Sequence, residues 1–252
     1  IVVKAKFVLS VDLRAELNKR NLEIVGANEE ENFLELADEV SLPSWPDFML
    51  NDEIANQHWY SLNVKHADFQ FALFEKDTGK WIAVGNSIPV FWDKPLKDLP
   101  DSGWDWALAS GMENSGPSNM LSALAIQILP AHRGGGLSSV MVRIMKEIGH
   151  HFGFDKLIAP VRPNKKCDYP LLSMESYLEW SRAGQRFDPW VRIHERLGGK
   201  ILKVCPLAMK IKGSIEDWQT WTGLSFQGSG DYVVNGALNT VRIDVEKNQG
   251  VY

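Results

Sequence analysis

Hydrophobic positions in the first third of the chain follow two different periods. The segments VVKAKFVL (residues 2–9) and LEIV (residues 22–25) are short apolar runs that predict strands. From residue 33 to 40 the apolar residues instead recur at helical spacing, and Asn32 is the expected N-cap. A second helix is predicted after Asn51, with its apolar face formed by Ile54, Ala55, Trp59 and Leu62.

Strict alternation then replaces the helical period. Phe69, Phe71 and Leu73 alternate with polar or small residues, the DTGK turn follows, and WIAVGNSIPVFW (81–92) returns, which predicts a β-hairpin. Residues 93–119 are rich in Pro, Gly, Ser and Asp, so we expect a long excursion over the surface that carries Trp104 and Trp106.

The second half continues the alternation of elements. We expect apolar strands at 121–129, 156–163, 200–213 and 232–245, the last with a glycine interruption. We expect helices at 138–152, ended by Gly153, at 189–197, and after Ser214 as an N-cap. No internal repeat or low-complexity tract occurs, so the pattern predicts a mixed, layered α/β fold.

Composition limits the classes of partner. Ten tryptophans and 44% hydrophobic residues suffice for a packed core, and the net charge of −5 gives no basic field for nucleic acid or an anionic membrane. No apolar run reaches about eighteen residues and no signal peptide is recognisable, so we expect a soluble cytoplasmic protein, although a removed segment before Ile1 stays open. Cys167 and Cys205 show no metal-ligand spacing with each other or with histidines and are interpreted as free buried thiols.

The stretch ILPAHRGGGLSSVMVRIM (126–143) places three glycines between an apolar strand and a helix. Such a connection predicts an anion site, because the first helical N–H groups lack partners and the helix dipole is positive there. A nucleotide P-loop is excluded by the missing Gly-Lys-Ser/Thr. A dinucleotide fingerprint fails because Ser139 stands at its third glycine and LIAPVRPN has no acidic residue. A tight connection without a ligand is the remaining alternative.

The same stretch resembles the pyrophosphate loop of the GNAT acyltransferases. The strand end is Ile128, Leu129 and Pro130, and the loop that we call the glycine loop is Arg133, Gly134, Gly135, Gly136, Leu137 and Ser138, where Ser138 replaces the usual Gly or Ala. Downstream, Asn164 matches an asparagine that faces pantetheine in the family, and VRIHERLGGKIL resembles the closing helix and strand, with His194 in place of tyrosine. The strings YPL, FDPW and SGDYVV are similar to those of an uncharacterised bacterial subgroup.

The resemblance implies a GNAT fold, a central mixed sheet flanked by helices, over residues 1–212. Insertions fall at about 93–119 and 166–188, and residues 213–252 form a C-terminal extension packed on the domain.

It also implies direct transfer of an acyl group, with acetyl-CoA or another acyl-CoA as co-substrate and no metal. The backbone of Gln127, Ile128 and Leu129 would pair with pantetheine, the N–H groups of the glycine loop would hold the pyrophosphate, and Arg133 or His132 would add charge. His194 is the candidate acid, with a packing role as its alternative. The general base stays unassigned, because Ser122 and Gln127 occupy the strand where the family often has Glu; the carboxylates near plausible rims are Glu113, Asp105, Glu175 and Glu179.

The insertion at 169–190 is rich in aromatic residues. We expect Tyr169, Met174, Tyr177 and Trp180 to form the wall or lid of an acceptor pocket, with core packing of an extra helix as the alternative. The neutral lid favours a small hydrophobic or aromatic amine as acceptor. Three functions remain open: an N-acyltransferase, an inactive CoA-binding or regulatory module, and a structural protein without cofactor. A homodimer is left open.

Overall fold

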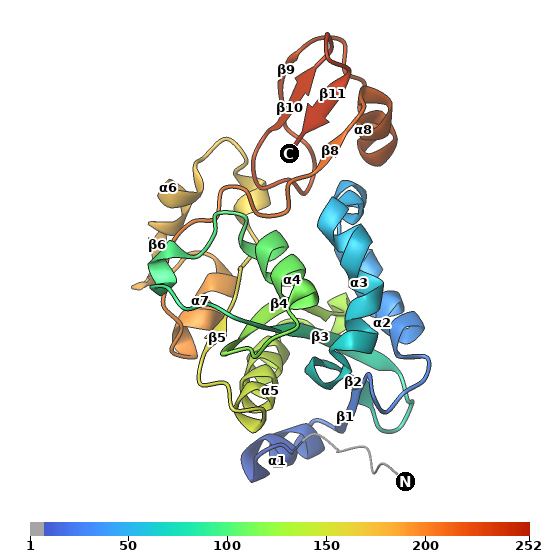
Figure 1. The fold of residues 1–252 in the computed structure, drawn as a ribbon, viewed down its shortest axis with the longest axis vertical. Coiled ribbons are helices and arrows are strands. Elements are labelled where there is room, and N and C mark those ends of the chain that lie inside the picture. Colours follow the sequence, from blue (N-terminus) through green and yellow to red (C-terminus); the bar gives the residue numbers. More distant parts are fainter. Residues whose placement is uncertain (1–7) are drawn as a thin grey trace. The chain divides into compact units, whose positions relative to one another are not determined.

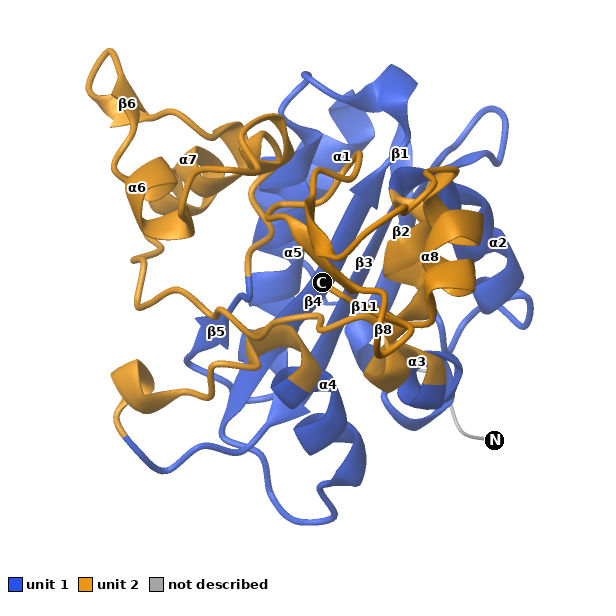
Figure 2. Cartoon of the chain, turned by 90° about the horizontal axis from the view of Figure 1, so that it is seen from above, with its two compact units in different colours: residues 1–44, 57–94, 106–160 blue, residues 45–56, 95–105, 161–252 orange. Residues whose placement is uncertain are grey.

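The computed structural model describes residues 8–252, which form two compact units (Figure 2). Unit 1 comprises the chain up to residue 44 together with 57–94 and 106–160, and unit 2 comprises 45–56, 95–105 and 161–252. Most of the strand expected at 2–9 lies outside the described residues. The division expected from the sequence, at residue 212, stays a prediction.

Unit 1 is built on a five-stranded mixed sheet (Figure 1). Its strands lie in chain order: β1 (Leu22–Gly26), β2 (Gln70–Glu75), β3 (Trp81–Val90), β4 (Met120–Ile128) and β5 (Leu157–Ile158). All neighbours are antiparallel except β4 and β5, which are parallel. The predicted hairpin of β2 and β3 is confirmed, and so is the mixed α/β class.

Helices cover both faces of this sheet because its strands alternate inward-facing apolar residues. On one face α5 (Leu137–His151) contributes its predicted apolar stripe, and α1 (Val11–Lys19) adds Leu13 and Leu17. On the other face α2 (Phe33–Ser41) packs Phe33, Ala37 and Val40 against Ala72 and Val84. Consecutive side chains of β1 point to opposite faces of the sheet, so Ile24 packs on the α5 side and Val25 on the α2 side.

Two helix termini test the capping predictions in unit 1. Gly153 has φ +81°, so it ends α5 in the left-handed conformation expected of a C-terminal glycine. Asn32 does lie at the N-cap of α2, but its side chain makes no capping hydrogen bond. Its backbone has φ −96° and ψ 22° rather than the extended conformation that capping side chains require. The role assigned to the Asn32 side chain was therefore wrong.

The expected surface excursion at 93–119 contains a helix, α4 (Gly103–Glu113), which corrects that prediction. Trp104, Ala107 and Leu108 are buried in it. A Cβ on Gly111 would lie 2.5 Å from the Ile88 side chain, so the small residues of this helix permit close packing on β3. Gly111, one of the residues that suggested a loop, therefore permits helix packing instead. A further helix, α3 (Glu53–Lys65), confirms the second helix predicted after Asn51.

Unit 2 has its own small antiparallel sheet. The strands lie in the order β8 (Lys212–Gly213), β11 (Gln249–Val251), β10 (Val241–Asp244) and β9 (Gly230–Tyr232). The helix α8 (Ile215–Thr222) buries Trp218 against Phe48, and Ser214 forms a full capping box with Asp217, which confirms the predicted cap. The remaining elements of the unit are α6 (Met174–Leu178), β6 (Ser181–Arg182), β7 (Gln185–Arg186) and α7 (Pro189–Arg196), the predicted helix at 189–197.

Three predicted strands are shorter than expected. Of 200–213 only Lys212–Gly213 is a strand, since Pro206 interrupts the segment and Met209 has φ +55°. Of 156–163 only Leu157–Ile158 pairs, because Pro160 and Pro163 lack a backbone donor. Of 232–245 the middle is a connection through Gly236 at φ +82°. Within residues 8–252, none of the helices combines the length and the apolarity that a bilayer crossing requires.

Candidate functional site

The glycine loop connects β4 to α5 and exposes a run of backbone donors. Gly134 has φ +85° and Gly136, the N-cap of α5, has φ +77°, a region that side chains with a Cβ rarely adopt. Within residues 8–252, no acceptor is bonded to the N–H groups of Gly134 to Ser138. These donors lie at the positive end of a 15-residue helix, so the loop is suited to bind an anion.

Two arginines hold the loop in this shape. Arg133 Nε donates to the carbonyl oxygen of Ile128 at 2.8 Å, which turns its guanidinium back toward the end of β4. Arg20 Nη1 donates to the carbonyl oxygen of Gly135 at 2.8 Å. Arg20 is itself paired with Glu16 at 3.1 Å, and Glu16 pairs with Arg143 of α5 at 2.6 Å. Sequence reasoning missed Arg20 because nothing near it marks a contact with a loop so distant in the chain.

His132, the other expected source of positive charge, lies with its Nε2 3.8 Å from Glu75 Oε1. Arg20 and Arg133 are the residues whose guanidinium groups donate to the carbonyl oxygens of Gly135 and Ile128.

The strand that leads into the loop has an open edge. β4 pairs with β5 only at Leu121↔Leu157 and Ser122↔Ile158, whereas on its other side it pairs with β3 as far as Ile128↔Ala83. Beyond Ser122 no strand in the described part of the chain pairs with β4 on the β5 side. Residues 125–128, which we call the open edge, can accept an extended ligand as an added strand. Gln127 and Ile128 lie on this edge, and Leu129 follows it.

Three buried amides lie across the α2 face of the sheet, and we call them the amide row: Gln70, Asn86 and Gln127. Gln70 Nε2 donates to the Ser87 carbonyl oxygen at 2.8 Å, and Asn86 Nδ2 donates to Gln70 Oε1 at 3.2 Å. Asn86 Oδ1 and Gln127 Oε1 are buried and have no partner in the described part of the chain. Asn86 and Gln70 were not selected from the sequence, although an asparagine inside WIAVGNSIPV is the sort of buried polar residue that signals a site.

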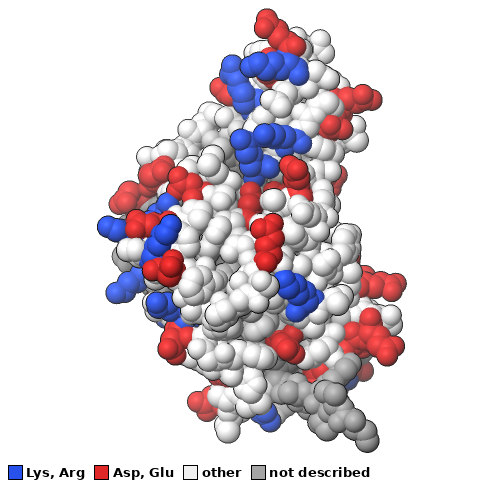
Figure 3. All heavy atoms as spheres, in the orientation of Figure 1, with Lys and Arg blue, Asp and Glu red and all other residues white. Residues whose placement is uncertain are grey.

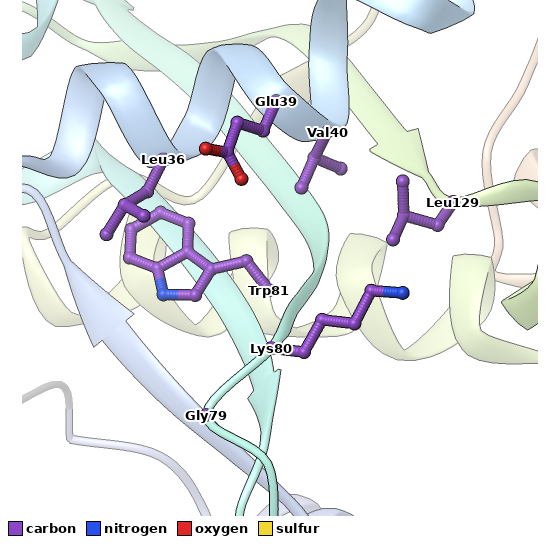
Figure 4. Close-up of a pocket in the computed structure, with 7 residues that line it drawn as sticks. All are labelled: Leu36, Glu39, Val40, Gly79, Lys80, Trp81 and Leu129. Carbon is purple, nitrogen blue, oxygen red and sulfur yellow. The ribbon is translucent and has the colours of Figure 1, made fainter.

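A pocket of about 330 Å³ lies between α2 and the start of β3 (Figure 4). It is lined by Leu36, Glu39, Val40, Gly79, Lys80, Trp81 and Leu129. Leu129 alone belongs to the predicted site, and no residue of the glycine loop lines the pocket. The loop is thus an exposed feature of the surface rather than part of this hollow.

The aromatic insertion folds around a buried hub in unit 2. Tyr169, Tyr177, Trp180 and Phe187 form the aromatic cluster, with ring centroids 4.8–6.1 Å apart. Tyr177 is 1% exposed, and its hydroxyl donates to Asp188 Oδ2 at 2.8 Å. Asp188 also accepts from the N–H groups of Lys165, Trp190 and Val191, so it caps α7 and ties the insertion together. Tyr177 is therefore a core residue of this segment, while Tyr169 and Trp180 remain exposed and Met174 is half-buried.

His194 lies on α7 with its ring 4.4 Å from that of Trp190. Its Nε2 is buried without a partner among residues 8–252, and burial lowers the pKa of the imidazole to about 4. Burial thus disfavours the protonated form that a general acid requires. The catalytic role of His194 as an acid stays a prediction.

The remaining candidates show no specialised geometry. Asn164 is exposed, and Cys167 and Cys205 are free thiols that are half-buried rather than fully buried. On the face drawn in Figure 3, acidic and basic side chains are interspersed.

The sequence and the structure were compared with those of known proteins. No protein-family model matches the chain. The arginine N-acetyltransferase avaD of Aspergillus versicolor is 32% identical over 197 residues, which covers 71% of this chain and 67% of that protein.

Two solved structures show the same fold. The loading GNAT-like domain of CurA from Lyngbya majuscula has a TM-score of 0.56 at 21% identity and covers 80% of this chain and 92% of that one. The GphF GNAT-like decarboxylase in complex with isobutyryl-CoA has a TM-score of 0.52 at 15% identity, covering 73% and 94% of the two chains.

Proposed function

The chain belongs to the GNAT superfamily of N-acetyltransferases, and from this premise we propose that it transfers an acetyl group from acetyl-CoA to the amine of a small molecule. The similarity to avaD carries this proposal, and the exposed donors of the glycine loop support it from the structure. A named enzyme as relative favours activity over the alternative of an inactive CoA-binding module.

The coenzyme would be held mostly by main chain. The N–H groups of the glycine loop are free to bind both phosphates of the diphosphate, with Arg20 and Arg133 adding positive charge beside them. The open edge offers N–H and C=O groups to the two amides of pantetheine in the manner of a strand. Asn164 remains a candidate for a further contact with pantetheine.

The chemistry needs a neutral amine, a stabilised oxyanion and a protonated leaving thiolate. The amine nitrogen forms a bond to the thioester carbonyl carbon, the C–S bond breaks, and the amine loses one proton while the thiolate gains one. A backbone N–H near Ile128 is the candidate oxyanion donor. Water bound by the unpaired oxygens of Asn86 and Gln127 would take the proton from the amine and carry it to the departing sulfur, so the step balances without a proton from the buried ring of His194.

Two classes of acceptor compete. The exposed aromatic residues Tyr169 and Trp180 suggested a hydrophobic or aromatic amine from the sequence. The relative acts on arginine according to its name, so arginine is the first acceptor that we would test. The predicted cytoplasmic location, the bacterial origin, a homodimer and the absence of nucleic-acid binding stay predictions.

Calorimetry and a thiol-release assay test the proposal together. We expect heat of binding and thermal stabilisation with acetyl-CoA, and release of free thiol when arginine or another amine of a panel is added. Binding without turnover on any acceptor would favour the inactive module. No binding at millimolar acetyl-CoA would remove both CoA-dependent functions.

A further inference from the structure

A cavity of about 510 Å³ opens beside helix α1 of unit 1. Among residues 8–252 it is lined by Ala15, Glu16, Lys19 and Arg20. Lys19 and Arg20 are exposed at the C-terminal end of α1, so their charged groups are accessible to a ligand. The cavity shares no lining residue with the pocket drawn in Figure 4.

Arg20 joins this cavity to the glycine loop. Its Nη1 donates to the carbonyl oxygen of Gly135 at 2.8 Å, and its Nη2 lies 3.7 Å from the position of a Cβ added to Gly136. The guanidinium therefore lies against the main chain whose N–H groups are free to bind a diphosphate. A group in the cavity and a diphosphate on the loop can accordingly belong to one ligand.

The basic residues at the cavity have donors that no group in the described part of the chain uses. A guanidinium has five N–H donors, and the side chain of Arg20 forms one hydrogen bond with Gly135 and one with Glu16. Arg143 of α5 also pairs with Glu16, at 2.6 Å. The Lys19 ammonium forms no hydrogen bond or ion pair within residues 8–252. We call Glu16, Lys19, Arg20 and Arg143 the α1 cluster.

Positive charge exceeds negative charge in the α1 cluster. The hydrogen bond from Arg143 and the nearby Arg20 hold the pKa of Glu16 below its ordinary value, so this carboxyl is ionised at neutral pH. Three cations against one carboxylate leave two positive charges. A phosphate monoester carries about −1.5 to −2 charges at pH 7, and arginine binds its oxygens through parallel hydrogen bonds. The cluster thus matches a terminal phosphate in charge and in hydrogen bonding.

We propose that the α1 cluster binds the 3′-phosphate of coenzyme A, with Lys19 and Arg20 as the donors. This inference rests on the proposed function, because it concerns the coenzyme of that reaction. In coenzyme A a single ribose joins the 3′-phosphate to the diphosphate, so the two anions are close in the ligand, as Arg20 and the glycine loop are close in the protein. Glu16 pairs with Arg20 and Arg143 and so fixes their guanidinium groups. The helix α1 therefore distinguishes coenzyme A from its 3′-dephospho form.

CoA and 3′-dephospho-CoA are a matched pair of probes, because they differ only in this phosphate. Calorimetric titration of the full chain with each compound requires no turnover. We expect the wild-type protein to bind CoA about tenfold more tightly than dephospho-CoA. This preference should decrease as the ionic strength rises, since the cluster is exposed to solvent.

Lys19→Ala should reduce the preference to about threefold or less and leave the affinity for dephospho-CoA unchanged. Arg20→Ala should also reduce the preference, but it should weaken the binding of dephospho-CoA as well, because Arg20 holds the Gly135 carbonyl. Lys156→Ala is the matched control, since Lys156 is an exposed lysine of unit 1 whose carbonyl oxygen accepts from Leu121, at the opposite end of β4 from the glycine loop. This variant should keep the full preference. Thermal melts show that each variant is folded.

The outcomes separate this inference from the proposed function. Equal affinities of the wild-type protein for CoA and dephospho-CoA overturn the 3′-phosphate site, while binding of both compounds still supports the glycine loop. A preference that survives in both Lys19→Ala and Arg20→Ala overturns the site too, since other residues then bind the phosphate. A preference that depends on Lys19, in a protein that releases no thiol with any amine, supports the site and favours the inactive module. If neither compound binds at millimolar concentration, the CoA-dependent function and this inference both fail.

Discussion

Arg20 and Gly135 lie 115 positions apart in the chain, yet the Arg20 guanidinium donates a hydrogen bond to the Gly135 carbonyl oxygen at 2.8 Å. This hydrogen bond fixes the peptide between Gly135 and Gly136, and the N–H groups of Gly134 to Ser138 have no acceptor among residues 8–252. The cation thus both fixes the main chain and adds positive charge beside the proposed diphosphate site.

Arg20→Ala should weaken CoA binding about three- to tenfold, since one charged hydrogen bond and one nearby cation are removed. Calorimetric titration with CoA measures the change. Arg242→Ala is the control, because Arg242 forms an exposed ion pair with Asp231 at 3.3 Å. This variant should bind CoA with the affinity of the wild-type protein. An undiminished affinity in Arg20→Ala would remove this residue from the site.

Gly136→Val should abolish measurable CoA binding. The backbone at φ +77° is strained for any residue with a Cβ, and a branched side chain blocks the approach of phosphate to the N–H groups. Gly79→Val is the matched control, because Gly79 has φ +68° in the β2–β3 turn, with no other atom within 4 Å of its added Cβ. The assignment of the glycine loop fails if both variants bind CoA equally well.

His194 should make stability depend on pH. In the folded protein the pKa of the His194 imidazole is about 4, against an ordinary value of 6.5. Between these two pH values the unfolded chain therefore binds a proton at His194 that the folded protein does not bind. Stability is therefore lost as pH falls from 6.5 toward 4, by about 2 kcal/mol between pH 7 and 5. Urea unfolding of wild-type protein and His194→Gln at both pH values isolates this contribution. The variant should lose about 2 kcal/mol less than the wild type. Equal losses would show that the imidazole titrates normally.

Asp105 should titrate in the opposite sense. Its pKa of about 7 in the folded state lies above the ordinary value of 3.8, so ionising the carboxyl disfavours folding as pH rises through this window. The nearby charge of Asp52 adds to the effect of burial. The free energy of unfolding of the wild-type protein should accordingly fall between pH 5 and 8, and that of Asp105→Asn should fall less. Urea unfolding at several pH values measures both profiles, and equal profiles contradict the expectation.

Substitutions of Tyr177 and Trp180 should distinguish core packing by the aromatic cluster from contact with the acceptor. Tyr177→Phe removes a buried hydrogen bond to Asp188 and should reduce the free energy of unfolding by about 1–2 kcal/mol with little effect on the KM for the acceptor. Trp180 is 36% exposed, so Trp180→Ala should raise that KM if the segment contacts the acceptor. Chemical unfolding and steady-state kinetics on both variants measure the two effects. A KM unchanged in Trp180→Ala would assign the whole cluster to packing.

Local patterns predicted the parts of the fold that depend on neighbours in sequence. The apolar stripe of α5, the β2–β3 hairpin and the Ser214 cap each arise from residues a few positions apart, and all three are confirmed. The errors lie where local signals conflict. Gly and Ser in α4 indicated a loop, but contacts with β3 select small residues there. Apolar residues near 201 indicated a strand, but Pro206 and the positive φ of Met209 prevent regular pairing.

In the candidate site, too, contiguous residues could be predicted and residues from distant segments could not. The glycine loop could be predicted because its residues are contiguous, and the family resemblance supplied the ligand. Arg20 and Asn86 could not be predicted, since their contacts are with segments that are distant in the sequence and meet only in the folded chain. Asp105 illustrates the limit: by composition it is an ordinary surface acid, and only its neighbours Asp52 and Met209 make it unusual.

The strands β4 and β5 part after Ser122, so the open edge lies inside the five-stranded sheet rather than at its rim. A pantetheine arm that docks there adds a sixth strand, so CoA should slow amide hydrogen exchange at residues 125–128.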